Sequence, residues 1–132
     1  MDKPSPRQTM FREPFPILTV QDPARSVRFY VDNFDFEVTY RWPDDGPVEF
    51  AYLQLGGHAM AVGSPRGGEA TGNGPPRCTM CFYVDDTDEA CERLLAAGVR
   101  QVTAPWDAEW GERMAVFEDP DGTPILVTAQ TS

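Results

Sequence analysis

The sequence repeats its own pattern with an offset of 64 residues. This shift places Val84 on Val20, Asp86 on Asp22 and Trp106 on Trp42. A chain of 132 residues has room for one compact domain or for two very small units that share a core. A unit of about 50 residues buries too little apolar surface to fold alone. The repeat therefore predicts two similar modules that pack together or pair with another chain.

Each half starts with an apolar run and a helix-start signal. The runs at residues 15–20 and 78–84 are typical of buried strands. After the first run, Asp22 is a candidate N-cap with Pro23 at the first helical position, where proline loses no hydrogen bond. After the second run, Asp86 starts a capping-box pattern with a glutamate three residues on. We expect a helix to follow each strand.

Apolar residues in both predicted helices recur at the spacing of a single helix face. These residues are Val27, Tyr30, Val31 and Phe34 in the first half and Cys91, Leu94 and Leu95 in the second. Gly98 is placed to end the second helix in a left-handed conformation.

Three extended segments follow each helix. They cover residues 36–42, 49–55 and 58–63 in the first half and 100–103, 113–118 and 123–128 in the second. Apolar and polar residues alternate in the first of them, which is typical of a half-buried strand. The turns Gly56–Gly57 and Asp119–Gly122 indicate hairpins. Each half therefore reads β-α-β-β-β, and the fold class is α+β.

Composition sets the expected boundaries and surroundings. Residues 1–13 read as a flexible tail, 14–64 and 77–130 as the two modules, and the Gly- and Pro-rich residues 65–76 as a linker. A net charge of −10 argues against nucleic-acid partners, and no apolar run is long enough for a membrane helix. Three cysteines without a full pairing set favour a reducing compartment, so we expect a cytoplasmic protein.

Two motifs resemble a known family. The run Trp110-Gly111-Glu112-Arg113 leads through a strand to Asp119-Pro120-Asp121-Gly122, and Val20-Gln21-Asp22 precedes Ser26-Val27-Arg28-Phe29-Tyr30. With the duplicated βαβββ pattern over residues 14–130, they resemble the vicinal oxygen chelate superfamily. Its members include glyoxalase I, extradiol dioxygenases, fosfomycin-resistance enzymes and bleomycin-resistance proteins. The resemblance implies paired curved mixed sheets with the helices outside, and a homodimer.

The resemblance also identifies where a metal would bind. Enzymes of this superfamily hold a divalent ion with His and Glu side chains from the first and last strands of each module. The matching positions here are Phe15, Thr79, Leu126 and, depending on a one-residue register, Ala61 or Val62. None of these side chains binds a metal ion. We therefore expect no metal, no other cofactor and no catalytic residue.

The remaining metal-binding residue types do not form a replacement site. His58 lies at a predicted turn, where a solvated side chain is expected. Cys78 and Cys81 are three apart in a predicted strand and so face opposite sides, and only Cys91 remains as a further thiolate. We interpret the three cysteines as buried thiols.

The resemblance implies a cup-shaped space between the sheets, where the family's enzymes hold their metal. Without a metal, this space becomes a pocket lined by apolar and aromatic residues. The predicted ligand-binding residues are Phe15, Trp42, Phe50, Thr79, Cys81, Trp106, Trp110, Arg113 and Leu126. Acidic residues in the neighbouring loops suit a positively charged ligand. They are Asp44, Asp45 and Glu49 in the first half and Asp107, Glu109 and Glu112 in the second.

Three functional hypotheses follow. The first is a non-catalytic protein that sequesters an aromatic natural product or antibiotic, as the family's drug-binding members do. The ligand is either neutral or positively charged. The alternative is a metal-dependent isomerase, lyase or dioxygenase whose ligands are not recognised above. A third is a scaffold or sensory module whose own side chains fill the cavity. For each single tryptophan, packing in the core is the alternative to contact with a ligand.

Overall fold

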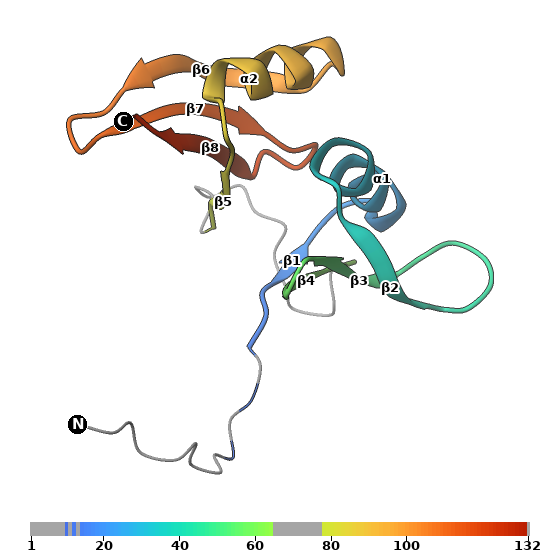
Figure 1. Cartoon of the computed structure of the whole chain (residues 1–132). Helices are drawn as coiled ribbons and strands as arrows, with labels where there is room; N and C mark the ends of the chain where they lie inside the picture. The colour runs from blue at the N-terminus through green and yellow to red at the C-terminus, as the bar shows by residue number, and fades with distance from the viewer. Residues whose placement is uncertain (1–9, 11, 13, 65–77, 132) are drawn as a thin grey trace, which may run out of the picture.

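The computed structural model describes residues 10, 12, 14–64 and 78–131. The predicted linker, residues 65–76, lies outside the described residues, as does the predicted tail apart from Met10 and Arg12. Two four-stranded sheets, each with one helix, make up the described part of the chain (Figure 1). The predicted α+β class and its two βαβββ modules are confirmed.

The first module contains four strands and one helix. Its elements are β1 (Ile17–Thr19), α1 (Pro23–Phe34), β2 (Glu37–Trp42), β3 (Phe50–Leu55) and β4 (His58–Gly63). The strand order is β1-β4-β3-β2, in which β1 runs parallel to β4 and the other pairs are antiparallel. The predicted hairpin at Gly56–Gly57 joins Leu55 to His58, which pair across β3 and β4.

The second module repeats this arrangement. Its elements are β5 (Met80–Tyr83), α2 (Thr87–Ala96), β6 (Arg100–Asp107), β7 (Glu112–Glu118) and β8 (Pro124–Gln130). The order β5-β8-β7-β6 matches the first sheet, again with one parallel pair, β5 and β8. Neither helix in the described part of the chain has the length and apolar character needed to cross a bilayer.

The predicted helix signals are confirmed. A side-chain oxygen of Asp22 accepts a hydrogen bond from the backbone N–H of Arg25 at 3.2 Å, and Asp86 does the same for Glu89 at 3.1 Å. These bonds satisfy N–H groups that have no partner within the helix. Gly98 follows α2 with a φ of 82°, the left-handed conformation expected there.

The core forms between each helix and one face of its sheet. Tyr30 and Phe34 of α1 and Cys91 and Leu94 of α2 are buried, as predicted from the helical spacing. The prediction for Leu95 is wrong, because 49% of this residue is exposed. It lies at the edge of the apolar face of α2, where the sheet does not cover it.

The internal repeat holds at the level of strand pairing. Trp42 in β2 pairs with Phe50 in β3, and Trp106 in β6 pairs with Met114 in β7. The same 64-residue shift relates both members of the two pairs. The two tryptophans therefore occupy equivalent positions in the two sheets.

A register shift in β2 changes which face its residues lie on. Val38 pairs with Leu53 on the helix-covered side, but Tyr40 pairs with Tyr52 on the other side, so Thr39 is an extra residue, as in a β-bulge. The predicted half-buried face of this strand is therefore wrong beyond Thr39. Val38, Tyr40 and Trp42 are 43%, 49% and 52% exposed.

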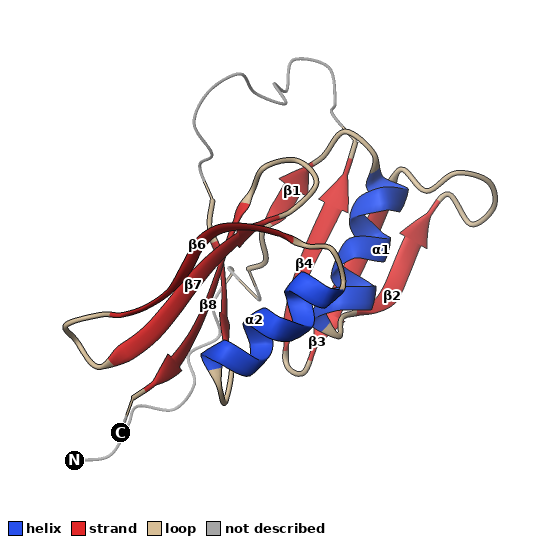
Figure 2. Cartoon of the chain, turned by 90° about the horizontal axis from the view of Figure 1, so that it is seen from above, coloured by secondary structure: helices blue, strands red, loops and turns tan. Residues whose placement is uncertain are grey.

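The two modules meet at α1. The stacked rings of Phe34 and Phe82 lie 4.6 Å apart between centroids, and the Tyr30 hydroxyl donates to Asp119 at 2.7 Å. A hydroxyl–carboxylate contact between Ser26 and Asp121 is longer, at 3.3 Å. Both helices lie on the same side of their sheets (Figure 2), so the uncovered faces of the sheets do not face each other. These contacts seat α1 against the end of the second sheet.

Candidate functional site

Aromatic side chains gather on the face of the first sheet that α1 does not cover. We call this surface the first open face. Its members are Phe15, Ile17, Tyr40, Trp42, Phe50 and Tyr52, as the strand register and ring contacts show. The ring of Tyr52 lies 4.7 Å from Phe15, 5.7 Å from Phe50 and 6.2 Å from Tyr40, centroid to centroid. Such a surface offers stacking contacts to a planar molecule.

The corresponding surface of the second sheet is mixed in character. This second open face consists of Cys81, Tyr83, Trp106, Glu112, Met114, Val116, Leu126 and Thr128, with Trp110 at its end. Tyr83 and Trp110 are 72% and 69% exposed, whereas Thr128 is buried. The second open face therefore combines accessible rings with polar groups.

Glu112 is the centre of the polar groups on this surface. Its Oε1 accepts hydrogen bonds from Trp110 Nε1 at 3.1 Å and from Thr128 Oγ1 at 3.3 Å. Its Oε2 accepts a bond from the Tyr83 hydroxyl at 3.4 Å. The charge of Glu112 is the main cause of a raised pKa for Tyr83. It adds to the effect of burial in raising the pKa of the Cys81 thiol.

The structure separates the predicted ligand-binding residues into two sets. Phe15, Trp42 and Phe50 lie on the first open face. Cys81, Trp106 and Leu126 lie on the second open face, with Trp110 at its end, and Thr79 is exposed just before β5. One chain does not bring the two sets together, because the two open faces do not face each other.

Arg113 does not lie on either open face. It follows Glu112 in β7 and so points to the side that α2 covers. Its Nε and Nη2 donate to Asp88 of α2 at 3.0 and 3.2 Å, and its Nη1 donates to Asp107 at 3.1 Å. These hydrogen bonds, that to Asp88 first, raise the guanidinium pKa. Arg113 therefore ties α2 to the sheet.

The strand register decides between Ala61 and Val62 as the first-module counterpart of Leu126. Ile17 pairs with Ala61 in the first sheet as Cys81 pairs with Leu126 in the second. Ala61 is thus the counterpart of Leu126, and Val62 faces the core. With Phe15 and Thr79, the four positions that carry metal ligands in the family's enzymes provide no imidazole or carboxylate. They do not fit a divalent ion.

The other metal-binding residue types lie apart from one another. Within residues 14–64 and 78–131, no three His, Cys, Asp or Glu side chains are grouped to hold an ion. His58 is exposed at its hairpin, as expected. The cysteines are free: Cys91 is buried as predicted, Cys78 is partly buried, and Cys81 is exposed, which corrects the prediction for this thiol. Among the described residues, none packs over Cys81 on the second open face, which leaves this thiol exposed.

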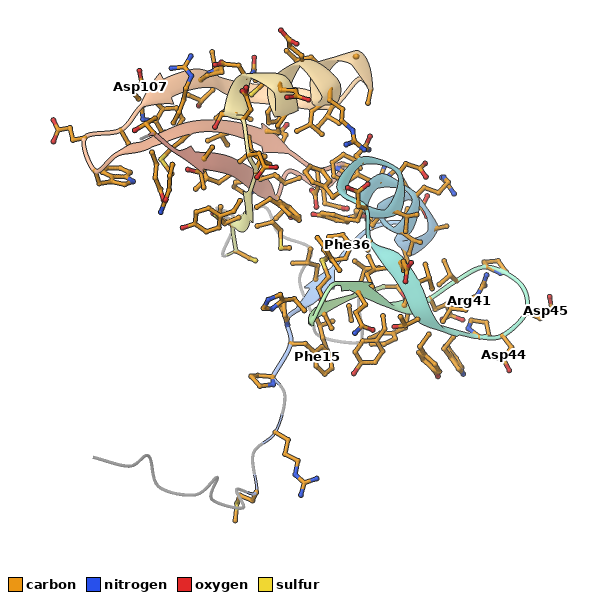
Figure 3. The ribbon with its side chains drawn as sticks, viewed as in Figure 1. Phe15, Phe36, Arg41, Asp44, Asp45 and Asp107 are labelled. Atoms are coloured by element: carbon orange, nitrogen blue, oxygen red, sulfur yellow. The ribbon has the colours of Figure 1, made fainter. Side chains whose placement is uncertain are left out.

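The predicted acidic rim is also divided. Figure 3 shows Asp44 and Asp45 in the loop between β2 and β3, beside Arg41, and Asp107 at the far end of the second sheet. Phe15 and Phe36 lie on opposite sides of the first sheet in the same view. Asp44 and Asp45 therefore lie at one end of the folded molecule and Asp107 at the other.

A cavity of about 320 Å³ lies on the helix side, between α1, β5 and α2. Phe34, Phe82 and Leu94 contribute apolar walls, and the ion pair of Arg93 with Asp35, at 3.4 Å, stands at its edge. None of the predicted ligand-binding residues lines it. Tyr83, a member of the second open face, does line it, so the cavity borders that face and is separate from the first open face.

The family match agrees with this architecture. Residues 8–127 match the Glyoxalase/Bleomycin resistance protein/Dioxygenase superfamily. The protein belongs to that superfamily, as its two motifs and duplicated βαβββ pattern predicted.

Several bacterial proteins are similar to this chain in sequence or in structure. An uncharacterized protein of Mycobacterium bovis, Mb0911c, is 36% identical over 115 residues, covering 81% of this chain and 76% of that protein. The uncharacterized protein YraH of Bacillus subtilis is 30% identical over 112 residues, covering 79% and 87%. The crystal structure of TioX from Micromonospora sp. ML1 superposes with a TM-score of 0.73 at 27% identity, covering 90% of this chain and 99% of TioX.

Proposed function

We propose that this protein is a non-catalytic binding protein that sequesters a flat aromatic small molecule. The observation that carries the proposal is the exposed aromatic surface of the first open face, at a place where the family's enzymes hold a metal. Tyr40 and Trp42 leave about half of their surface in contact with solvent. Exposed apolar patches of this kind mark binding surfaces. Bleomycin resistance proteins, which the family's description includes, fit such a role.

The ligand would bind between two copies of the chain. Contacts of α1 with the second module hold the two open faces of one chain apart. In a homodimer with twofold symmetry, the first open face of one subunit is placed opposite the second open face of its partner, which creates two equivalent grooves. Each groove would combine the tyrosine- and tryptophan-rich surface of one subunit with the mixed surface around Glu112 of the other.

Fluorescence titration tests this function. Acridine, a planar uncharged compound near neutral pH, is added to the purified protein, followed by a bleomycin, a mitomycin and other intercalating compounds. We expect saturable quenching of the tryptophan emission. Tyr40→Ala should weaken the binding by about five-fold, because it removes a stacking surface and leaves the three tryptophans in place.

Leu95→Ala is the matched control. Leu95 and Tyr40 are equally exposed, at 49% each, but Leu95 lies on α2 away from the open faces. Its substitution should leave affinity unchanged. Sedimentation at several concentrations should show a dimer. Absence of saturable quenching by every compound, or equal loss in both variants, would contradict the proposal.

Metal analysis separates this function from the enzymatic alternative. Protein dialysed without chelator should hold no stoichiometric Mn²⁺, Ni²⁺, Fe²⁺ or Zn²⁺, and EDTA should not change acridine binding. Near-stoichiometric metal would instead support a metal-dependent isomerase, lyase or dioxygenase.

A further inference from the structure

The carboxylate of Glu112 is held in place on the second open face. Its three hydrogen-bond donors come from β5, from β8 and from the turn before β7, through Tyr83, Thr128 and Trp110. Donors on three separate segments fix both the position and the orientation of the group. A carboxylate offers about four acceptor sites, so a further donor can still bind, most readily at Oε2, which accepts a single bond here.

The negative charge of Glu112 is not neutralised by a neighbour. All three donors are neutral, and no Lys, Arg or His among the described residues forms an ion pair with it. Glu118, on the same strand and the same face, is different, because it pairs with Arg100 at 3.1 Å. The raised pKa of Tyr83 reflects the uncompensated charge.

Aromatic rings flank this charge. Tyr83 and Trp110 both bond to the carboxylate and leave most of their surface exposed, and Trp106 lies on the same face at 37% exposure. Ring faces attract cations, and a carboxylate forms charge-assisted hydrogen bonds that are stronger than neutral ones. A fixed anion between accessible rings is therefore suited to a planar cation with N–H groups.

We propose that Glu112 is the residue that selects a positively charged ligand, by accepting a hydrogen bond from a protonated nitrogen of a planar molecule stacked on Tyr83 and Trp110. This inference rests on the proposed binding function and adds the charge of the ligand to it. Glu112 contacts the ligand directly and takes part in no reaction.

The test compares two probes of similar shape and size. 9-Aminoacridine is a planar cation with N–H donors near neutral pH, and acridine is its uncharged analogue. Wild-type protein should bind the cation about ten-fold more tightly than the neutral compound at low salt. Glu112→Gln should reduce binding of 9-aminoacridine by about ten-fold and that of acridine by less than about two-fold.

Glu118→Gln is the control, because it removes a charge from the same strand and face at a carboxylate that already has a cationic partner. It should change neither affinity by more than about two-fold. Thermal unfolding of each variant checks its folding, and the wild-type comparison of the two probes stands even where Glu112→Gln does not fold.

The outcomes separate the two proposals. Equal wild-type affinity for both probes, or equal losses in the two variants, overturns the role of Glu112 and leaves the binding function intact. Failure of both probes and of every compound in the wider panel to bind overturns both.

Discussion

The hydroxyl of Tyr30, in α1 of the first module, donates a 2.7 Å hydrogen bond to Oδ2 of Asp119, in the β7–β8 turn of the second. Both residues are buried. The other oxygen of Asp119 accepts bonds from the backbone N–H groups of Asp121 and Thr123. The Asp-Pro-Asp-Gly turn thus shapes its own loop and also joins the two halves of the repeat.

Tyr30→Phe should destabilise the protein by about 1–3 kcal/mol, because it leaves Oδ2 of buried Asp119 without a donor. Urea denaturation followed by circular dichroism measures this free energy of unfolding. Tyr83→Phe is the control, since that hydroxyl also donates to a carboxylate but from an exposed position. A loss for Tyr30→Phe no larger than for Tyr83→Phe would show that the buried bond contributes little.

The same tyrosine should make the protein sensitive to alkali. Burial first, and then the charge of Asp119, raise the pKa of Tyr30 above its ordinary value. Above about pH 10 the unfolded chain releases this proton and the folded chain keeps it, so the free energy of unfolding falls as the pH rises. Denaturation at several pH values should show the advantage of wild type over Tyr30→Phe shrinking above that pH. If the free energy of unfolding depends on pH in the same way for wild type and Tyr30→Phe, this prediction is wrong.

Arg113→Met should lower the thermal unfolding midpoint by a few degrees without changing acridine affinity. The substitution removes the paired bonds to Asp88 and the bond to Asp107, all on the helix side of the sheet. Arg93→Met provides the comparison, because Arg93 forms one longer ion pair, to Asp35, at a more exposed place. Its effect should be smaller. A loss of ligand affinity in Arg113→Met but not in Arg93→Met would show that Arg113 takes part in ligand binding.

Alkylation of Cys81 should respond to Glu112. Burial and the charge of Glu112 raise the pKa of this thiol, which lowers the fraction of reactive thiolate near neutral pH. Glu112→Gln should speed its reaction with iodoacetamide by about three-fold at about pH 8. Peptide mass spectrometry follows each cysteine separately, and buried Cys91 should not change. An unaltered rate at Cys81 would mean that the two groups do not interact.

Local signals predicted the elements of the fold well. The N-caps Asp22 and Asp86, the left-handed Gly98 and the Gly56–Gly57 turn each depend on a few neighbouring residues, and all are present. Strand β6 is longer than expected, since it continues through Pro105 to Asp107. Proline is tolerated there because β6 lies at the edge of its sheet and needs only one hydrogen-bonded neighbour.

The candidate site was harder to predict, because the side of the sheet on which a residue lies depends on how its strand pairs with the neighbouring strands. In β7 the apolar residues 114–117 are consecutive, so their order does not show which side α2 covers. The Trp-Gly-Glu-Arg motif predicts a ligand-binding role for Arg113, and the sequence places Glu112 only in an acidic rim. Once the pairing of Trp106 with Met114 is known, counting back two residues from Met114 places Glu112 on the open side.

The extra residue at Thr39 decides which residues of β2 lie on the first open face. Phe36 and Val38 lie on the side of α1, whereas Tyr40 and Trp42 of the same alternating run lie on the first open face. Deleting Thr39 would turn either the aromatic half or the core half of the strand over. A change in length by one residue, with every other residue retained, would thus exchange the buried and exposed sides of one half of β2.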